Sequence, residues 1–261
     1  MSSSLFSRIV VGVDDSEPSQ RAVDFALRIA AQYKGQVTAV HGVDWASAVS
    51  SLEAGLSVAD PQPVVDALRT EGRALLANVT AQARSAGIAC DEQLIDGTPV
   101  DAILTAAKKA GALVIVLGTH GRGGFARLVL GSVAESTIRS SEIPVLAVHP
   151  KDELPPASQP LFEKVVAAID PHESGRAVQI AKTPMTVDRA VDYARGHLET
   201  EGSPVEGKAA DAIVAEAKNR GAALIVMGTR GRPGLERFFS GSVTENVLQT
   251  APVPVLIVHP S

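Results

Sequence analysis

The chain has 261 residues, of which 45% are apolar and 20% are charged, with 24 Lys and Arg against 29 Asp and Glu. This length allows one or two domains, and this composition excludes a disordered chain. A net charge of −5 and only nine aromatic residues disfavour nucleic-acid binding, which normally uses a basic surface and stacking aromatics. The same net charge disfavours binding to an anionic membrane surface.

Cysteine usage and the N-terminal residues bear on the cellular compartment. The single cysteine, Cys90, cannot form a disulfide within the chain. The first eight residues lack the basic start and apolar run of a signal peptide, and no apolar stretch approaches the roughly 18 residues of a membrane span. We therefore expect a cytoplasmic protein that makes no use of nucleic acid or membrane.

The first half has strand and helix patterns that alternate along the chain. Apolar runs predict strands at 9–13, 36–41, 90–95, 112–117 and 145–148. Helices are predicted from Ser16, with Pro18 in the first turn, and over 64–86, 99–110 and 132–140. The segment 43–63 is predicted to be a long loop. Such alternation is typical of a doubly wound, Rossmann-like α/β fold with a parallel sheet.

The second half repeats much of the first. Two segments recur at an offset of 110 residues, 110–122 as 220–232 and 143–150 as 253–260. The opening strand recurs at an offset of 156, so the second copy is about 46 residues shorter. We predict a complete domain at 1–150, a proline-rich linker at 151–160, and a shortened domain at 161–261.

The shortened copy keeps its first strand at 165–169, a helix at 209–219 and the last two strands. The segment 177–196 contains an element whose type the pattern leaves open. No counterpart of Val37–Val43 is present, so the second sheet is predicted to be narrower and to lack the second strand.

A glycine-rich loop after a predicted strand is the main candidate site. Gly118 and Gly121 are followed, after nine intervening residues, by Gly131 and Ser132. Glycines allow backbone N–H groups to approach an anion, and a helix N-terminus favours phosphate. Alternatively, Ser132 with Glu135, and Ser242 with Glu245, form capping boxes that begin a helix without any ligand. Both interpretations can hold together. Neither copy has the Walker or dinucleotide-binding pattern.

The whole pattern resembles the universal stress protein family in its tandem form. The resemblance rests on Val11-Gly12-Val13-Asp14-Asp15-Ser16, on the glycine-loop spacing found in both copies, and on the closing strand at 144–148. It implies two α/β domains of the family's Rossmann-like fold and, in the ATP-binding branch, a bound adenine nucleotide (ATP, AMP or ADP) with Mg²⁺.

The resemblance also implies roles for residues of the first copy. Asp14 is expected to contact the nucleoside, and the backbone from His41 through Gly42 to Val43 to contact adenine. Ribose and phosphates are assigned to the loop and the following helix: Gly118, Gly121, Arg122, Gly131, Ser132 and Val133. Asp14 or Asp15 is expected to help hold nucleotide-bound Mg²⁺.

Two departures from the family pattern matter. Gly42 stands where the family usually has valine, which is expected to weaken apolar contact with the base. The second copy keeps five of the corresponding residues: Asp170, Gly228, Gly231, Gly241 and Ser242. Because its adenine-contacting strand is absent, we expect this second site to be degenerate or to bind only phosphate.

Three functions follow from these observations. The preferred one is a nucleotide-binding stress regulator that holds ATP in the first half. The alternatives are a ligand-free interaction scaffold and a slow ATP hydrolase or phosphotransferase, for which no catalytic residue set stands out. Because single-domain relatives pair through their last strands, the segments 145–148 and 255–258 are expected to face each other as an internal pseudo-dimer. Two chains are then expected to be able to form a homodimer.

Overall fold

The computed structural model describes residues 4–53, 60–119, 130–169, 179–182, 185–196, 202–204, 208–228 and 243–259. The first half forms five parallel strands, β1 (Arg8–Gly12), β2 (Gln36–Val43), β3 (Cys90–Asp96), β4 (Val114–Gly118) and β5 (Val145–Val148). Its helices are α1 (Glu17–Tyr33), α2 (Trp45–Glu53), α3 (Gln62–Ser85), α4 (Pro99–Ala110) and α5 (Ser132–Ser140), after a short 3-10 turn at Leu5–Ser7. The alternation predicted from the sequence is therefore confirmed.

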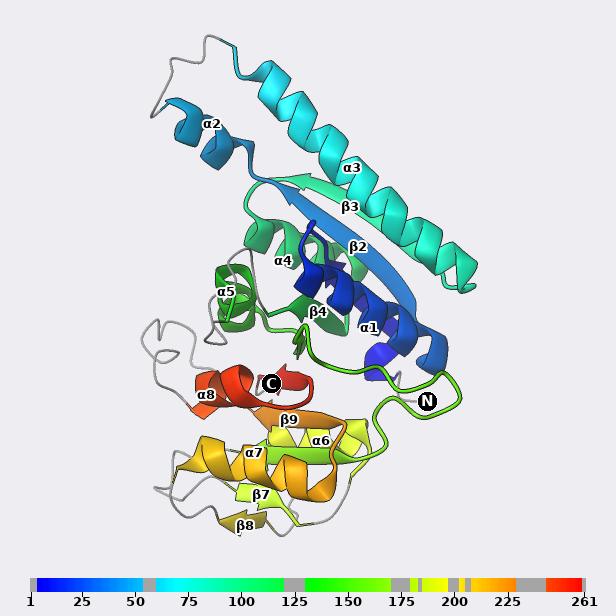
Figure 1. Cartoon of the computed structure of the whole chain (residues 1–261), viewed down its shortest axis with the longest axis vertical. Helices are drawn as coiled ribbons and strands as arrows, with labels where there is room; N and C mark the ends of the chain where they lie inside the picture. The colour runs from blue at the N-terminus through cyan, green and yellow to red at the C-terminus, as the bar shows by residue number, and fades with distance from the viewer. Residues whose placement is uncertain are drawn as a thin grey trace.

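The second half adds the strands β6 (Val165–Ile169), β7 (Gln179–Ala181), β8 (Gly202–Pro204), β9 (Leu224–Gly228) and β10 (Val255–Val258), with the helices α6 (Val187–Ala194), α7 (Ala209–Arg220) and α8 (Val243–Thr250). All ten strands form one mixed, mostly parallel sheet in the order β3-β2-β1-β4-β5-β10-β9-β6-β7-β8. Figure 1 shows the two halves stacked along the longest axis of the molecule. Among the described helices, none combines the length and the hydropathy needed to cross a membrane.

Helices cover both faces of the sheet. Buried residues of α1, α3 and α6 form one core with Val11, Leu146 and Leu256, while those of α4, α5, α7 and α8 form another with Ile115 and Ile257. Side chains alternate between the faces along each strand, so every central strand is buried on both sides, as the continuous apolar runs predicted. Helix α2 lies beyond the sheet and contacts α3, with which it projects from the body of the molecule (Figure 1).

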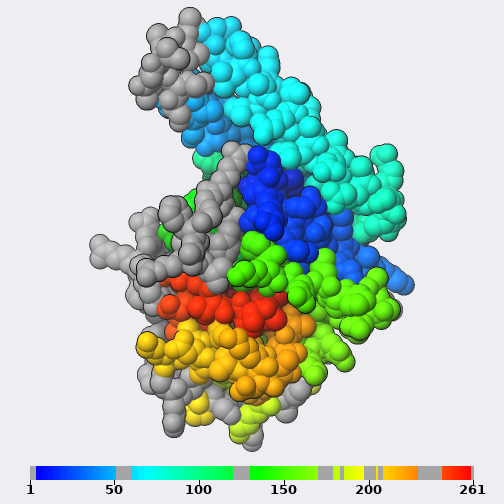
Figure 2. Space-filling model, in the orientation of Figure 1, coloured from blue at the N-terminus to red at the C-terminus, as the bar shows by residue number. Residues whose placement is uncertain are grey.

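The two halves meet through their last strands. Strand β10 pairs antiparallel with β5, with Val255 opposite Ala147, Leu256 opposite Leu146 and Ile257 opposite Val145. All of these residues are 0% exposed. The predicted pairing of 145–148 with 255–258 is therefore confirmed. Figure 2 shows the C-terminal segment (red) between the green residues of the first half and the orange residues of the second half.

The segment between the halves, 149–164, contains no helix or strand. It lies along α1, where the guanidinium of Arg28 donates hydrogen bonds to the carbonyls of Pro156, Ala157 and Gln159 at 3.4, 3.2 and 2.7 Å. The amide N–H of Leu161 donates to the side chain of Gln32 at 2.8 Å. The division at 150 and 160 remains our prediction for the domain boundaries.

Two predicted elements need correction in the first half. The segment 43–63, predicted as a loop, contains α2, which begins after Asp44 because this carboxylate accepts hydrogen bonds from the backbone N–H (3.2 Å) and the hydroxyl (2.7 Å) of Ser47. Helix α3 begins at Gln62, two residues earlier than predicted. Ser16 is confirmed as the N-cap of α1, accepting from the amide N–H of Ser19 at 3.2 Å.

The second half differs from the prediction of a narrower sheet. In the first half β2 lies beside β1, and in the second half β7 takes the corresponding place beside β6. Strand β8 lies at the outer edge next to β7, so each half contributes five of the described strands to the sheet. Both β7 and β8 are only three residues long and pair antiparallel. The missing strand is therefore replaced by a short antiparallel pair.

Because of this replacement, helix α6 runs in the opposite direction to α1 relative to the parallel strands that each helix covers. Strand β7 runs back from the carboxyl edge, and the bridge between Met185 and Val165 places the chain at the amino edge of the sheet before α6 begins. Helix α6 covers β6 and β9 as α1 covers β1 and β4. However, α6 runs in the same direction as β6 and β9, whereas α1 runs opposite to β1 and β4. The carboxyl edge of the first half therefore meets the N-terminus of α1, and that of the second half meets the C-terminus of α6.

Candidate functional site

A cavity of about 140 Å³ opens at the carboxyl edge of the first half of the sheet. It lies between the ends of β1 and β4, where the chain leaves the sheet toward α1 on one face and toward α5 on the other. In open α/β sheets, ligands bind at such a switch point. The structure brings together seven of the predicted site residues in its lining: Asp14, His41, Gly42, Gly118, Gly131, Ser132 and Val133.

Asp14 supplies the carboxylate of the cavity. Its Oδ1 accepts hydrogen bonds from the amide N–H (2.9 Å) and the hydroxyl (2.5 Å) of Ser16, and its own amide N–H donates to Ser19 Oγ at 2.9 Å. These bonds fix the start of α1, which is the structural role that Asp14 would have without any ligand. They engage only Oδ1, and within the described residues Oδ2 has no hydrogen-bond partner, so one oxygen remains for a ligand.

The end of β2 presents backbone polar groups to the cavity. Val43 bonds toward β3, since its carbonyl accepts from the amide N–H of Gly97 at 3.1 Å, whereas the carbonyl of Val40 accepts from Val13 on the other side at 2.8 Å. Backbone groups alternate between the two sides of a parallel strand, so the N–H and C=O of Gly42 face the side where β1 has ended. The His41 ring donates from Nδ1 to the Val13 carbonyl at 2.7 Å and packs near Gly72 of α3.

Gly42 also has a packing role that its place in the sequence did not reveal. A Cβ atom at this position would lie 2.9 Å from Pro99 Cα and 3.1 Å from Ala102 Cβ, both on α4. The start of α4 therefore rests directly on the backbone of β2, and Pro99 and Ile103 line the cavity with apolar surface.

Replacing Gly42 with valine is expected to destabilise the protein by about 1–3 kcal/mol, because backbone atoms of α4 must shift to admit the side chain. Thermal unfolding followed by circular dichroism measures this cost. Gly87 has a left-handed backbone (φ +70°), and a Cβ atom there would have no neighbour within 4 Å. Gly87→Val is therefore a comparison variant in which backbone strain destabilises the protein without any steric overlap. An unchanged midpoint for Gly42→Val would contradict the close approach of α4.

The N-terminus of α5 forms the opposite wall. Its N-cap is Gly131, with φ −61° and ψ 142°, and no side chain caps this end. The alternative capping box of Ser132 and Glu135 is therefore wrong, because Ser132 lies within the first turn and not at the cap. The corresponding box of Ser242 and Glu245 stays a prediction, since Ser242 lies outside the described residues. The amide N–H of Gly131 donates to the carbonyl of Thr119 at 2.6 Å, which joins the two stems of the glycine loop. The first amides of α5 and the positive end of its dipole face a cavity suited to an anion.

Gly118 is required by packing as well as by position. A Cβ atom here would overlap backbone atoms of Pro18 in the first turn of α1. The glycine lets α1 begin directly over the end of β4. Two other predicted residues are not in its lining, since Val43 is turned toward β3 and Asp15 lies outside. Gly121 and Arg122 lie outside the described residues.

Several residues of the site escaped the sequence analysis. Ser19 is buried and ties α1 to the end of β1, and Pro99 and Ile103 come from α4. Thr98 caps α4 by accepting from the amide N–H of Asp101 at 3.2 Å, so a Thr-Pro pair after a strand was a readable signal that α4 begins at this edge. Among the described residues, no group of three or more His, Cys, Asp or Glu could hold a metal ion.

The corresponding edge of the second half is built differently. A Cβ atom on Gly228 would overlap the carbonyl oxygen of Ala194, at the C-terminus of α6. A helix C-terminus carries partial negative charge, so it disfavours an anion where the first half has a helix N-terminus. Asp170, Gly231, Gly241 and Ser242 lie outside the described residues.

Comparison with known proteins gives a consistent family relationship. The model of the universal stress protein family matches residues 5–149 and again 157–259. A universal stress protein of Methanocaldococcus jannaschii is 33% identical over 150 residues, covering 57% of this chain and 86% of that protein. One of Mycobacterium tuberculosis is 28% identical, with 97% of both chains covered. The crystal structure of a universal stress protein from Archaeoglobus fulgidus has a TM-score of 0.67 at 19% identity, covering 98% of this chain and 99% of that one.

Proposed function

The chain belongs to the universal stress protein family, and from that premise we propose that it is a regulator that binds one adenine nucleotide, ATP, AMP or ADP, in its first half. The observation that carries this proposal is the cavity at the ends of β1 and β4. It combines a carboxylate oxygen without a hydrogen-bond partner among the described residues, the backbone edge of β2 and a helix N-terminus that no side chain caps.

These three features match the chemistry of a nucleotide. The N–H and C=O of Gly42 offer the donor and acceptor that the polar edge of adenine requires, between apolar walls from Pro99 and Ile103. In this proposal, Asp14 Oδ2 accepts hydrogen bonds from the ribose hydroxyls, and the α5 amides of Ser132 and Val133 donate to phosphate. Magnesium would be bound by phosphate oxygens, with Asp14 as the nearest carboxylate, while Asp15 lies outside the cavity.

The structure of the second half supports a single site per chain. The reversed α6 places the carbonyl of Ala194 against Gly228, where the first half has the start of α1. We therefore infer that the second half serves to hold the first through the β5–β10 pair, and that a homodimer, where it forms, uses other surfaces.

A direct test is to denature freshly purified protein and identify any released nucleotide by mass spectrometry, followed by calorimetric titration with ATP. We expect an adenine nucleotide, and on refilling a stoichiometry of one per chain. Guanosine triphosphate, which differs at the edge facing Gly42, is the matched control and is expected to bind much more weakly. Absence of released nucleotide together with no binding of ATP would favour the interaction scaffold.

A further inference from the structure

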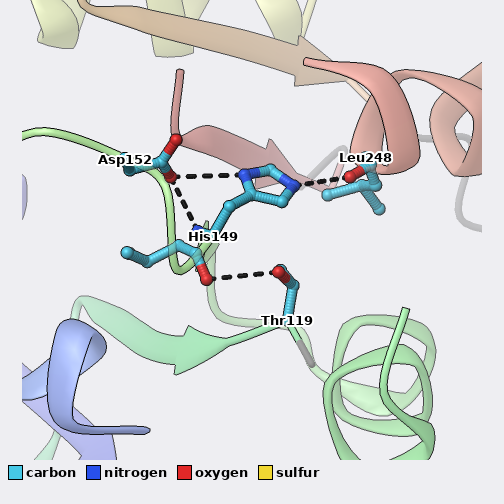
Figure 3. Close-up of polar contacts among 5 residues, drawn as sticks. Thr119, His149, Asp152 and Leu248 are labelled. Atoms are coloured by element: carbon cyan, nitrogen blue, oxygen red, sulfur yellow. Dashed lines mark hydrogen bonds and ion pairs between the residues drawn. The ribbon is translucent and has the colours of Figure 1, made fainter. Parts of the chain in front are cut away.

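A buried histidine joins the two halves next to the candidate site. His149 follows β5, and its side chain lies between Asp152 of its own turn and the carbonyl of Leu248 on α8 of the second half (Figure 3). His149 is 4% exposed and Asp152 is 3% exposed. The contact with Leu248 therefore spans the junction of the halves, away from bulk water.

Both ring nitrogens of His149 face acceptors. Nδ1 lies 3.2 Å from Asp152 Oδ2, and Nε2 lies 2.6 Å from the Leu248 carbonyl oxygen. A neutral imidazole has a single N–H, whereas the protonated ring has two, so this arrangement is fully satisfied only by the imidazolium. Asp152 Oδ2 also accepts from the amide N–H of His149 at 2.7 Å, which fixes the carboxylate beneath the ring.

The charges around the ring support the protonated form. Burial acts to lower the pKa of His149, but the hydrogen bond and the charge of Asp152, with the Leu248 carbonyl, outweigh it and raise the pKa above its ordinary value. From α8, the titratable side chain is Glu245, whose carboxylate accepts a hydrogen bond from Gln249. Strands β4, β5 and β10 carry no titratable side chain.

The contact is also connected to the stem of the glycine loop. The carbonyl of Val148, one residue before His149, accepts from the amide N–H of Thr119 at 3.0 Å and from its hydroxyl at 3.2 Å (Figure 3). Thr119 in turn accepts from Gly131, the N-cap of α5. Hydrogen bonds, joined through the Val148–His149 peptide bond, thus connect the wall of the cavity to α8.

We propose that His149 and Asp152 form a pH-sensitive clamp that fastens α8 of the second half to the end of β5. In acid the imidazolium donates to both Asp152 and Leu248. On deprotonation the ring loses one of its two N–H donors. Either the Asp152 carboxylate or the Leu248 carbonyl then loses its hydrogen bond from the ring while it stays buried. The clamp therefore weakens as the pH rises.

The pseudo-equivalent residue, 110 positions later, provides an internal control. His259 follows β10 as His149 follows β5, and Ile138 on α5 is the sequence counterpart of Leu248 on α8. Burial lowers the pKa of His259, and the Ile138 carbonyl opposes this less strongly. The pKa values of the two junction histidines are therefore shifted in opposite directions.

The direction of the pH effect follows from linkage. A histidine whose folded-state pKa is raised stabilises fully below the unfolded value of about 6.5, and this contribution is lost as the pH rises through the folded-state pKa. His259 acts oppositely, since acidification must protonate a ring that is buried neutral. Its effect therefore appears below a pH of about 6.5.

The test is the thermal unfolding midpoint of the full chain, without nucleotide, at intervals between about pH 5.5 and 8.5. The midpoint of the wild type is expected to fall on the alkaline side. His149→Gln and Asp152→Asn are expected to lower it by roughly 5 °C or more at pH 6 and to remove the alkaline fall. His259→Gln is expected to keep the alkaline fall of the midpoint. It is expected to lose part of the decrease in midpoint below a pH of about 6.5. Equal alkaline slopes in wild type and His149→Gln would overturn the clamp.

A second measurement uses the wild type alone, in case the variants do not fold. Amide hydrogen exchange of α8 is compared at pH 6 and pH 8 after correction for intrinsic rates, with α7 as the internal reference. Protection of α8 is expected to decrease several-fold more than that of α7 at the higher pH. An equal change in the two helices would overturn the proposal.

Discussion

Replacing Gly131 with valine is expected to weaken ATP binding by at least about 100-fold while leaving the protein folded. The backbone of Gly131, at φ −61° and ψ 142°, lies in a region that valine adopts readily. Loss of a favourable N-cap residue costs about 1 kcal/mol, a small part of the stability of a domain. The isopropyl group, however, is added to the wall of a cavity of about 140 Å³, beside the helix amides proposed for phosphate.

The matched control for this change is Gly241→Val, at the same position of the second glycine loop. It is expected to leave both the affinity and the stoichiometry of ATP binding unchanged, as measured by calorimetry. Circular dichroism confirms that both variants are folded. Equal loss of binding from the two substitutions would contradict a single site in the first half.

Truncating Leu146 to alanine is expected to cost about 3–5 kcal/mol of unfolding free energy, because it opens a void where the two halves meet. Leu146 is 0% exposed and lies directly opposite Leu256, also 0% exposed, in the β5–β10 pair. Both leucines belong to the core that α1 and α6 cover. Urea unfolding followed by circular dichroism gives the difference.

The comparison for this variant is Leu104→Ala on α4, where the leucine is only partly buried against the other core. A distinctly smaller cost is expected there, since less apolar surface is lost. Leu256→Ala and the double variant complete a cycle, in which the two central leucines should couple by about 0.5–3 kcal/mol. A cost below that of Leu104→Ala would show that the halves do not depend on this contact.

Most of the candidate site was predictable because its residues follow strands. Asp14 comes after β1, Gly42 lies near the end of β2 and Gly118 ends β4, so a parallel sheet must bring all three to one edge. Gly131 joins them because the start of α5 returns to the same edge. The contact of α4 with the backbone of β2 was not predictable, because nothing local to Pro99 shows that it rests on Gly42, 57 positions earlier.

The errors concern short or weakly patterned segments. Strands β7 and β8 have three residues each, too few for an alternating pattern, and their pairing depends on β6 rather than on their own side chains. Helix α2 lacked a strong apolar face, although Asp44 as an N-cap was a readable signal. Ser132 was assigned to the cap because the Ser-x-x-Glu pattern does not by itself fix the register of a helix start.

The amino-acid sequence alone was enough to identify a duplication with an unequal second copy, the alternation of strands and helices in the first copy, and the glycines at the ends of β4 and β9. These features are local patterns or repeats, which can be read without knowledge of tertiary contacts. Which end of a helix meets each carboxyl edge depends on tertiary contacts. In the first half α1 begins beside Gly118, whereas in the second half α6 ends beside Gly228. The reason is physical: helix direction depends on which way the preceding strand pairs, and that pairing is a contact between distant segments rather than a property of either one.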